Sequence, residues 1–157
     1  MIRSRTIAYR VIRLWWRVAR PRTLGARVLI VDAEGRVLLI RHTYRRGWHL
    51  PGGGVRRAES FEAAARREAR EEVGVILGAP LELLGMYYSD DEGKFDHIAV
   101  YVARVWEGTP TSDRKEIAET AWLSSDADPP VGLSSWTRRW LEDLAGPMGE
   151  NSSAEDS

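Results

Sequence analysis

The sequence GGVRRAESFEAAARREAREEVGV, at residues 53–75, predicts a glycine-rich loop followed by a helix. Ser60 is a suitable N-cap and Gly74 a suitable C-terminal stop, so we expect the helix to cover residues 60–73. At about 100° per residue, Glu68, Glu71 and Glu72 fall within roughly 100° of one another on one face of this helix. Three neighbouring carboxylates repel one another, so the cluster calls for an explanation.

Two explanations are open from the residues alone. Like charges at this spacing cost only a few tenths of a kcal/mol per pair on an exposed helix. Ion pairs at i, i+4 spacing, Glu62 with Arg66 and Arg67 with Glu71, offset part of that cost. The cluster is then an ordinary solvated face. The other explanation is a divalent cation, because Mg²⁺ takes oxygen ligands and is held by carboxylates together with water and substrate phosphates.

The composition is that of a globular protein with one core. The chain has 157 residues, of which 43% are hydrophobic and 29% charged. Its 23 basic and 23 acidic residues balance, so overall charge gives no reason to expect nucleic-acid binding. The absence of cysteine excludes disulfides and thiolate metal sites and fits a reducing compartment. We therefore expect a cytoplasmic protein without a specific nucleic-acid partner.

The first 22 residues differ in charge from the rest, because they contain seven arginines and no acidic residue. Helical periodicity places an apolar face opposite an arginine stripe, and Pro21 ends the predicted helix. The apolar face comprises Ile7, Val11, Ile12, Leu14, Trp15, Val18 and Ala19. This face packs on the domain or on a second subunit in a homodimer, lies on an anionic membrane surface, or belongs to a transit peptide. We divide the chain into this helix (1–22), a central domain (23–145) and a disordered acidic tail (146–157).

The central domain reads as a mixed α/β (α+β) fold. The run ARVLIVDAEGRVLLIRH places two apolar segments around a turn at Gly35 and predicts a β-hairpin. YRRGWHLPGGG predicts a loop. LELLGMYYS and HIAVYVARVW predict strands, and KEIAETAWLS predicts a short strand or a turn. LSSWTRRWLEDLA predicts a closing amphipathic helix. The apolar contacts of that helix should be Leu133, Trp136, Trp140, Leu141 and Leu144.

The spacing within residues 53–75 resembles the Nudix box, the signature of the Nudix hydrolase family. The pattern is G, five residues, E, seven residues, RE, an aliphatic residue, one residue, EE, one residue, G and an aliphatic residue. Every fixed position is matched, and Ala69 stands where a larger aliphatic residue is commoner. The resemblance extends over about residues 23–144. It implies the Nudix fold, an α/β/α sandwich with a mixed sheet, and hydrolysis of a nucleoside diphosphate linked to another group X.

The resemblance also implies a metal site. It makes Mg²⁺ or Mn²⁺ the expected cofactor of a pyrophosphatase that acts on phosphorus-containing anhydrides. Glu68, Glu71 and Glu72 match the positions that bind this metal, and the backbone carbonyl of Gly52 matches a further ligand.

Three other carboxyl and guanidinium groups receive roles from the resemblance. Arg67 and Glu59 match positions that orient the catalytic helix and its loop through an ion pair. Glu116 resembles a downstream glutamate that binds metal or activates water in some members. Glu119 is the alternative to Glu116, and either is otherwise an ordinary surface acid.

Candidates for substrate binding lie around the glycine-rich loop. Arg41, Arg45 and Arg46 are candidates to meet phosphates, unless they are exposed loop charges. Trp48, Tyr87, Tyr88 and Phe95 are candidates to stack on a base, unless they belong to the core. We interpret His42 as a hydrogen-bonding loop residue, because no second histidine lies at ligand spacing.

The identity of X is open. ADP-ribose-cleaving members carry a proline where this chain has Asp90 and Asp91, so the pattern favours a nucleoside triphosphate or a nucleotide sugar. Two alternatives are a non-catalytic, nucleotide-sensing Nudix-like module and a membrane-surface Nudix enzyme acting on a lipid-linked diphosphate. Removal of RNA caps is a further alternative, although no basic path for RNA continues beyond the N-terminal segment.

Overall fold

The structure is a computed structural model that describes residues 11–12, 14–15, 22–89, 95–112, 115–124 and 127–146. Within the predicted N-terminal helix, Val11, Ile12, Leu14 and Trp15 are helical and exposed. The rest of that helix and the tail predicted after Gly146 lie outside the described residues. None of the helices in the described ranges has the length and apolar character needed to cross a bilayer.

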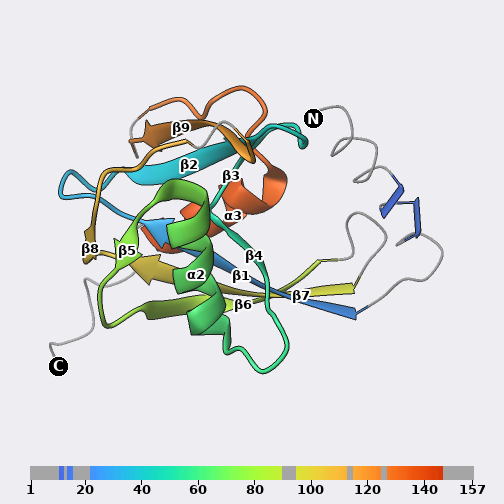
Figure 1. Ribbon diagram of the computed structural model, residues 1–157. Helices are drawn as coiled ribbons and strands as arrows, with labels where there is room; N and C mark the ends of the chain where they lie inside the picture. The colour runs from blue at the N-terminus through green and yellow to red at the C-terminus, as the bar shows by residue number, and fades with distance from the viewer. Residues whose placement is uncertain are drawn as a thin grey trace, which may run out of the picture.

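The strands form a mixed sheet, an antiparallel sheet and a two-stranded ribbon (Figure 1). The mixed sheet has the order β4 (Gly52–Gly54), β1 (Arg22–Ile30), β7 (Phe95–Ala103) and β6 (Glu82–Ser89). Only the β1–β7 pair is parallel among these. The antiparallel sheet has the order β3 (Trp48–His49), β2 (Val37–His42) and β9 (Ile117–Leu123). The ribbon pairs β5 (Ile76–Leu77) with β8 (Trp106–Glu107).

Helix α2 (Phe61–Val73) has the caps that the sequence predicts. The hydroxyl of Ser60 accepts a hydrogen bond from the backbone N–H of Ala63 at 3.1 Å. Gly74 adopts φ 72°, a left-handed conformation that costs glycine little. Fully buried alanines face the sheets, so the helix backbone lies close to the strands. These alanines are Ala64, Ala65 and Ala69.

Helix α3 (Ser135–Ala145) packs on the other side of the strands, which completes an α/β/α arrangement (Figure 1). Trp140 is its most buried apolar residue, 3% exposed, and packs among Leu29, Val100 and Val102. The predicted apolar contacts of this helix all belong to the same cluster, so that prediction is confirmed.

Two expectations for the chain before α2 were wrong. The turn at Gly35 exists, with φ 76°, but the strands on either side separate into different sheets and share only a Val31–Val37 bridge. Each strand therefore finds partners far along the sequence, and no regular hairpin forms. The expected glycine loop is also partly strand, because Gly52–Gly54 pairs antiparallel with β1. Backbone pairing requires no side chain, so three glycines satisfy it.

Candidate active site

The loop before α2 is joined to the helix by Arg67 and Glu59. Arg67 donates from Nε to Oε1 of Glu59 at 2.8 Å and from Nη2 to Oε2 at 3.0 Å. Arg67 Nη2 also donates to the carbonyl of Gly54 at 3.0 Å, and the N–H of Arg56 donates to Glu59 at 2.8 Å. The hydrogen bonds from Arg67, and to a smaller extent that from the Arg56 backbone, lower the pKa of Glu59 to about 2. The predicted ion pair is therefore present and fixes the glycine strand against the helix.

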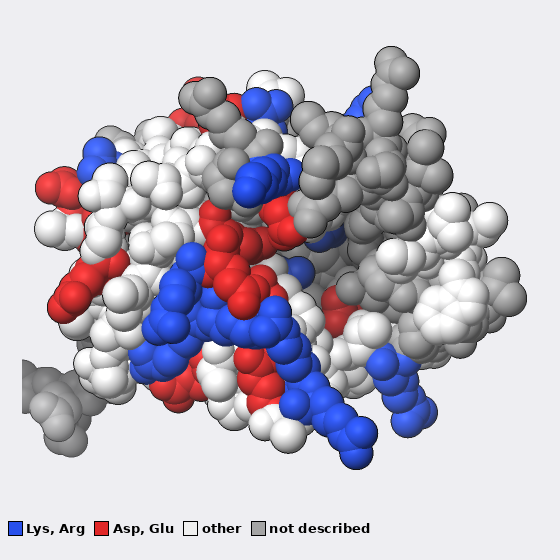
Figure 2. Space-filling view, in the orientation of Figure 1, with Lys and Arg blue, Asp and Glu red and all other residues white. Residues whose placement is uncertain are grey.

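Two of the three clustered glutamates are paired with arginines. Glu68 accepts from Nη1 of Arg67 at 2.5 Å. Glu71 accepts from Nη1 of Arg67 at 3.2 Å and from Arg56 at 3.3 Å. Figure 2 shows acidic side chains gathered at the centre of this face and bordered by basic ones. The arginines thus offset the repulsion that the sequence led us to expect.

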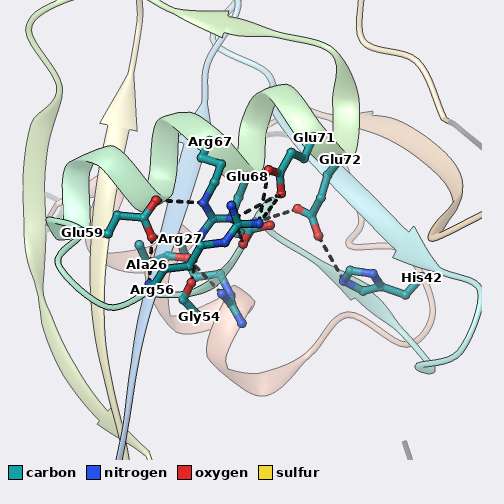
Figure 3. Close-up of polar contacts among 11 residues, drawn as sticks. Ala26, Arg27, His42, Gly54, Arg56, Glu59, Arg67, Glu68, Glu71 and Glu72 are labelled. Carbon is teal, nitrogen blue, oxygen red and sulfur yellow. Dashed lines mark hydrogen bonds and ion pairs between the residues drawn. The ribbon is translucent and has the colours of Figure 1, made fainter. Parts of the chain in front are cut away.

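Glu72 is the buried member of the cluster, with a side chain 8% exposed. Its Oε2 accepts a hydrogen bond from the backbone N–H of Gly52 at 2.8 Å, and its Oε1 lies 4.0 Å from Nε2 of His42 (Figure 3). Burial raises the pKa of Glu72 to about 8, with smaller contributions from the charges of Glu68 and Glu116; the Gly52 N–H and Arg27 oppose the rise. Without a cation, this carboxyl is therefore substantially protonated near neutral pH.

Glycines provide the space around these carboxylates. A Cβ on Gly53 would lie 2.3 Å from Oε1 of Glu68. A Cβ on Gly52 would lie 2.2 Å from the carbonyl oxygen of Ala26, and Gly52 also has φ 146°. Larger residues would therefore displace Glu68 or the strand pairing, which explains why glycine stands at both positions.

The donor set suits a hard cation, although it is not assembled around one. Among the described residues, no group of three His, Cys, Asp or Glu side chains has ligand geometry. Glu68 and Glu72 nevertheless lie close enough for their charges to interact, and carboxylate oxygens are the ligands that Mg²⁺ prefers. Glu71, which is half-exposed, would join them by exchanging its contacts with Arg56 and Arg67 for the cation. The residues therefore fit Mg²⁺ chemically.

Of the two downstream candidates, Glu116 lies nearer the buried carboxyl. Its charge raises the pKa values of Glu72 and Tyr44. Glu119 instead forms an ion pair with Arg41 on the neighbouring strand β2. The catalytic role of Glu116 stays a prediction.

The predicted phosphate-binding arginines do not lie together. Arg45 lines a pocket beside α3, and its charge lowers the pKa values of His42 and Arg27. Arg41 packs over the Trp48 ring, 5.8 Å from its centroid, and pairs with Glu119. Arg46 has an exposed position, and its carbonyl lies 2.9 Å from Nε2 of His49. Arg45 thus shares a pocket with Arg27 and Asp96, whereas Arg41 is paired with Glu119.

Of the predicted stacking residues, Trp48 lies on β3 of the antiparallel sheet, and the other three lie on the mixed sheet, on both of its faces. Tyr87 faces α3, where its hydroxyl donates to Asp143 at 2.7 Å and its ring meets Trp140 edge-on. Tyr88 lies on the other face, stacked with Phe95 at 6.4 Å between centroids, and is half-exposed. Successive strand residues point to opposite faces, so one base cannot stack on both tyrosines.

The sequence reading missed Arg27, Asp96 and the burial of His42. Arg27 interrupts the apolar run ARVLIV, a signal that was present in the sequence. Asp96, 7% exposed, accepts from the hydroxyl of Thr23 at 2.9 Å. The pKa of His42 is lowered to about 3, chiefly by burial. The charges of His49, Arg27 and Arg45 act in the same direction. Within the described part of the chain, Nδ1 of His42 has no hydrogen-bond partner, and His42 is the last residue of strand β2, so our interpretation of His42 as a hydrogen-bonding loop residue was wrong for that atom and for its place.

The comparison with known proteins agrees with this geometry. The chain matches the NUDIX domain over residues 21–144. It is 29% identical over 136 residues to a putative 8-oxo-dGTP diphosphatase of Bacillus subtilis, a match that covers 86% of this chain and 89% of the relative. It is 32% identical to the uncharacterized Nudix hydrolase YfcD of Salmonella typhi, a match that covers 70% of this chain and 62% of that relative.

A solved structure shares the fold over most of its length. The MutT NUDIX hydrolase from Burkholderia pseudomallei superposes with a TM-score of 0.71 and 31% identity. The superposition covers 78% of this chain and 98% of the other. The complete glutamate and glycine pattern, the ion pair beneath it and these similarities show that the chain belongs to the Nudix family.

Proposed function

We propose that this protein catalyses Mg²⁺-dependent hydrolysis of a nucleoside diphosphate linked to another group, with a nucleoside triphosphate as the favoured substrate. The observation that carries the proposal is the placement of Glu68 and Glu72 against the same glycine strand. Gly53 leaves room only for the Glu68 carboxylate, and Gly52 donates to Glu72. Two acidic groups are thereby held against one strand, and Gly53 of that strand also lines a cleft.

The chemistry follows from charge. A pyrophosphate repels an attacking water through its own negative charge. Bound Mg²⁺ would neutralise part of that charge and lower the pKa of water. The chain itself would hold the carboxylates in place through Arg67 and would supply a carboxylate that accepts the proton of the attacking water. Glu116 is the candidate for that acceptor, because its charge already acts on the buried Glu72.

The choice of a nucleoside triphosphate rests on the relatives. One is named a putative 8-oxo-dGTP diphosphatase, and another, 35% identical over 109 residues, a putative mutator protein from Mycobacterium tuberculosis. Since the match to the second covers only 40% of that relative, its activity does not transfer directly. A structural neighbour at 18% identity is a UDP-X diphosphatase and supports the fold alone. A nucleotide sugar is the second substrate class to test, because the sequence pattern at Asp90 and Asp91 left it open beside a nucleoside triphosphate.

The test is phosphate or pyrophosphate release from a panel of substrates with Mg²⁺ and with Mn²⁺. The panel comprises ordinary and oxidised nucleoside triphosphates, nucleotide sugars, ADP-ribose and dinucleoside polyphosphates. Glu72→Gln is the inactive variant, and Glu107→Gln, on the short ribbon strand β8, is the matched control. Turnover that Glu72→Gln abolishes and Glu107→Gln retains would establish the function. Nucleotide binding without turnover of any substrate would instead support the nucleotide-sensing module.

A second candidate function places the enzyme on a membrane, acting on a lipid-linked diphosphate. The observation in its favour is that Val11, Ile12, Leu14 and Trp15 are 44% to 65% exposed within a segment that carries seven arginines and no acid. An amphipathic helix of this composition binds anionic bilayers. A homodimer would cover the same apolar side chains.

Vesicle sedimentation separates these possibilities. The full-length protein should pellet with phosphatidylglycerol-containing vesicles and not with phosphatidylcholine alone. The double change Leu14→Ser with Trp15→Ser should abolish pelleting, whereas Leu83→Ser, at an exposed position of β6, should not. Absence of pelleting together with a dimeric mass in light scattering would assign the segment to subunit contact.

A further inference from the structure

Arg27 is a charged side chain at the start of the apolar half of β1. Val28, Leu29 and Ile30 follow it in β1 and are fully buried. Arg27 pairs with Gly52 across the β1–β4 register, and a Cβ on Gly52 would lie 2.9 Å from both Cα and Cδ of Arg27. Because Gly52 has no side chain, the Arg27 side chain has room to extend past the catalytic loop.

The guanidinium of Arg27 lies among acidic groups. Burial and, less strongly, the charge of Arg45 lower the pKa of Arg27. The charges of Glu72, Asp96 and Glu68 act in the opposite direction. The one hydrogen bond that its side chain makes to the described residues runs from Nη1 to the carbonyl of Ala26 at 2.9 Å (Figure 3). A guanidinium has five N–H donors in a planar fork, so most of them are not engaged by that bond. Arg27 is thus a positive charge close to Glu72 and Glu68, and most of its N–H donors are not used by its bond to Ala26.

Arg27 also lines two hollows of the surface, one beside the glycine strand and one beside α3. The outer hollow, about 530 Å³, is bounded by Leu24, Gly53 and Val55. The inner pocket, about 130 Å³, is bounded by Ser89 and Trp136 at the start of α3. Arg27 and Asp96 contribute to the walls of both. A molecule that occupies either hollow therefore meets the Arg27 side chain.

We propose that Arg27 is a phosphate-binding residue of this site, which offsets the carboxylate charge in the free protein and donates to the substrate's diphosphate when the substrate is bound. The proposal rests on the proposed function and adds a residue that the Nudix box does not contain. A planar guanidinium matches two phosphate oxygens at once, which an ammonium cannot do. Its position beside Glu72 and Glu68 brings it to the place where the diphosphate must lie if those residues hold the cation.

The proposal makes two predictions of opposite sign. Arg27 repels a cation that approaches the glutamates, so Arg27→Met should bind Mn²⁺ several-fold more tightly than the natural protein when no nucleotide is present. The same change removes donors to phosphate, so the affinity for nucleotide should fall by about 10-fold to 100-fold, the range typical of hydrogen bonds to charged groups. Arg27→Lys keeps the charge and loses the fork, so it should leave Mn²⁺ affinity unchanged and still weaken nucleotide binding.

The experiment is titration calorimetry of the full-length protein, first with Mn²⁺ alone and then with a methylene-bridged, non-hydrolysable deoxynucleoside triphosphate at saturating Mn²⁺. Arg104→Met is the matched control, because Arg104 borders a separate cavity between Val31 and Leu141. It should change neither affinity. Circular dichroism melting would confirm that each variant is folded.

These outcomes distinguish a failure of the proposed function from a failure of the role of Arg27. If the natural protein binds no nucleotide, the proposed function fails. If the natural protein binds and Arg27→Met binds equally well, only the role of Arg27 fails. A fall in both the Mn²⁺ and the nucleotide affinity of Arg27→Met, with Arg27→Lys behaving like the natural protein, would also overturn the proposal, since it would show that the charge only holds the loop in place.

Discussion

Arg67 and Glu59 form a two-bond fork that ties the catalytic loop to the catalytic helix. The hydrogen bonds measure 2.8 and 3.0 Å, and both side chains are largely buried, 15% and 14% exposed. The same guanidinium donates to Glu68 at 2.5 Å, so the fork also fixes a predicted metal ligand. Loop position and ligand position therefore depend on one side chain.

Replacement of Arg67 by lysine should impair turnover more than folding. Lysine keeps the charge but cannot donate to Glu59, Glu68 and Gly54 in one plane. We expect kcat/KM to fall by about 100-fold, the order of loss that a displacement of about 1 Å produces in an active site. Steady-state kinetics and thermal melting measure the two effects. Arg138→Lys, on the far helix α3, is the control, and equal activity of both variants would contradict the role of the fork.

The Glu59 carboxyl should make stability depend on pH in the acid range. Its pKa is held at about 2, below the ordinary value of 4.5, by Arg67 and the Arg56 N–H. A lowered pKa contributes stability that is complete above pH 4.5 and is lost as pH falls toward 2. Urea unfolding at several pH values should show the natural protein more stable than Glu59→Gln at neutral pH, with the difference shrinking toward pH 2. A difference that is constant with pH would refute this.

The buried Glu72 should couple proton release to metal binding. Its pKa is about 8 in the cation-free folded protein, compared with the ordinary value of 4.5 in the unfolded chain. Between these two pH values the folded protein keeps the proton and the unfolded chain has lost it. This contribution to stability is present below pH 4.5 and is lost as pH rises through 8. Binding of Mg²⁺ to a carboxylate must displace that proton, so the affinity should rise by about tenfold per pH unit below pH 8.

Two measurements check this linkage. Calorimetry of Mg²⁺ binding in buffers of different ionisation enthalpy counts the protons released, and melting with and without Mg²⁺ or a chelator at several pH values follows the stabilisation. Glu72→Gln should release no proton and should lose most of the Mg²⁺-induced shift. Proton release that persists in Glu72→Gln would assign the proton to another group.

The glycines of the catalytic loop should differ in their tolerance of alanine. A Cβ on Gly53 meets the carboxylate of Glu68 at 2.3 Å, whereas a Cβ on Gly54 meets only the carbonyl of Leu24 at 3.9 Å. Gly53→Ala should fold, because the Glu68 side chain is able to move, but its kcat/KM should fall by about 100-fold. Gly54→Ala should be nearly unchanged in activity and melting temperature. Similar loss in both variants would show that loop flexibility matters more than space for Glu68.

Helices were predictable because their determinants are local. Ser60 and Gly74 were sufficient to predict where α2 begins and ends, and the apolar spacing around Trp140 was sufficient to predict α3. The longer strands were predictable as segments, since their apolar pattern is also local, whereas the glycine strand β4 was not, because it has no side chains to form a pattern. The partners of the strands were not predictable, because pairing joins residues far apart in the sequence.

The catalytic face likewise combines features that follow from the local sequence with features that depend on distant segments. The sequence alone determined that Glu68, Glu71 and Glu72 share one helix face, because a helix of 3.6 residues per turn allows no other arrangement. It also determined which glycines precede them. Only the tertiary structure decided that Glu72 is the buried carboxyl, that Gly52 pairs with Arg27, and that Asp96 from β7 completes the cleft wall. Burial and charge depend on chain segments brought together by the sheet, and one segment of sequence does not contain that information.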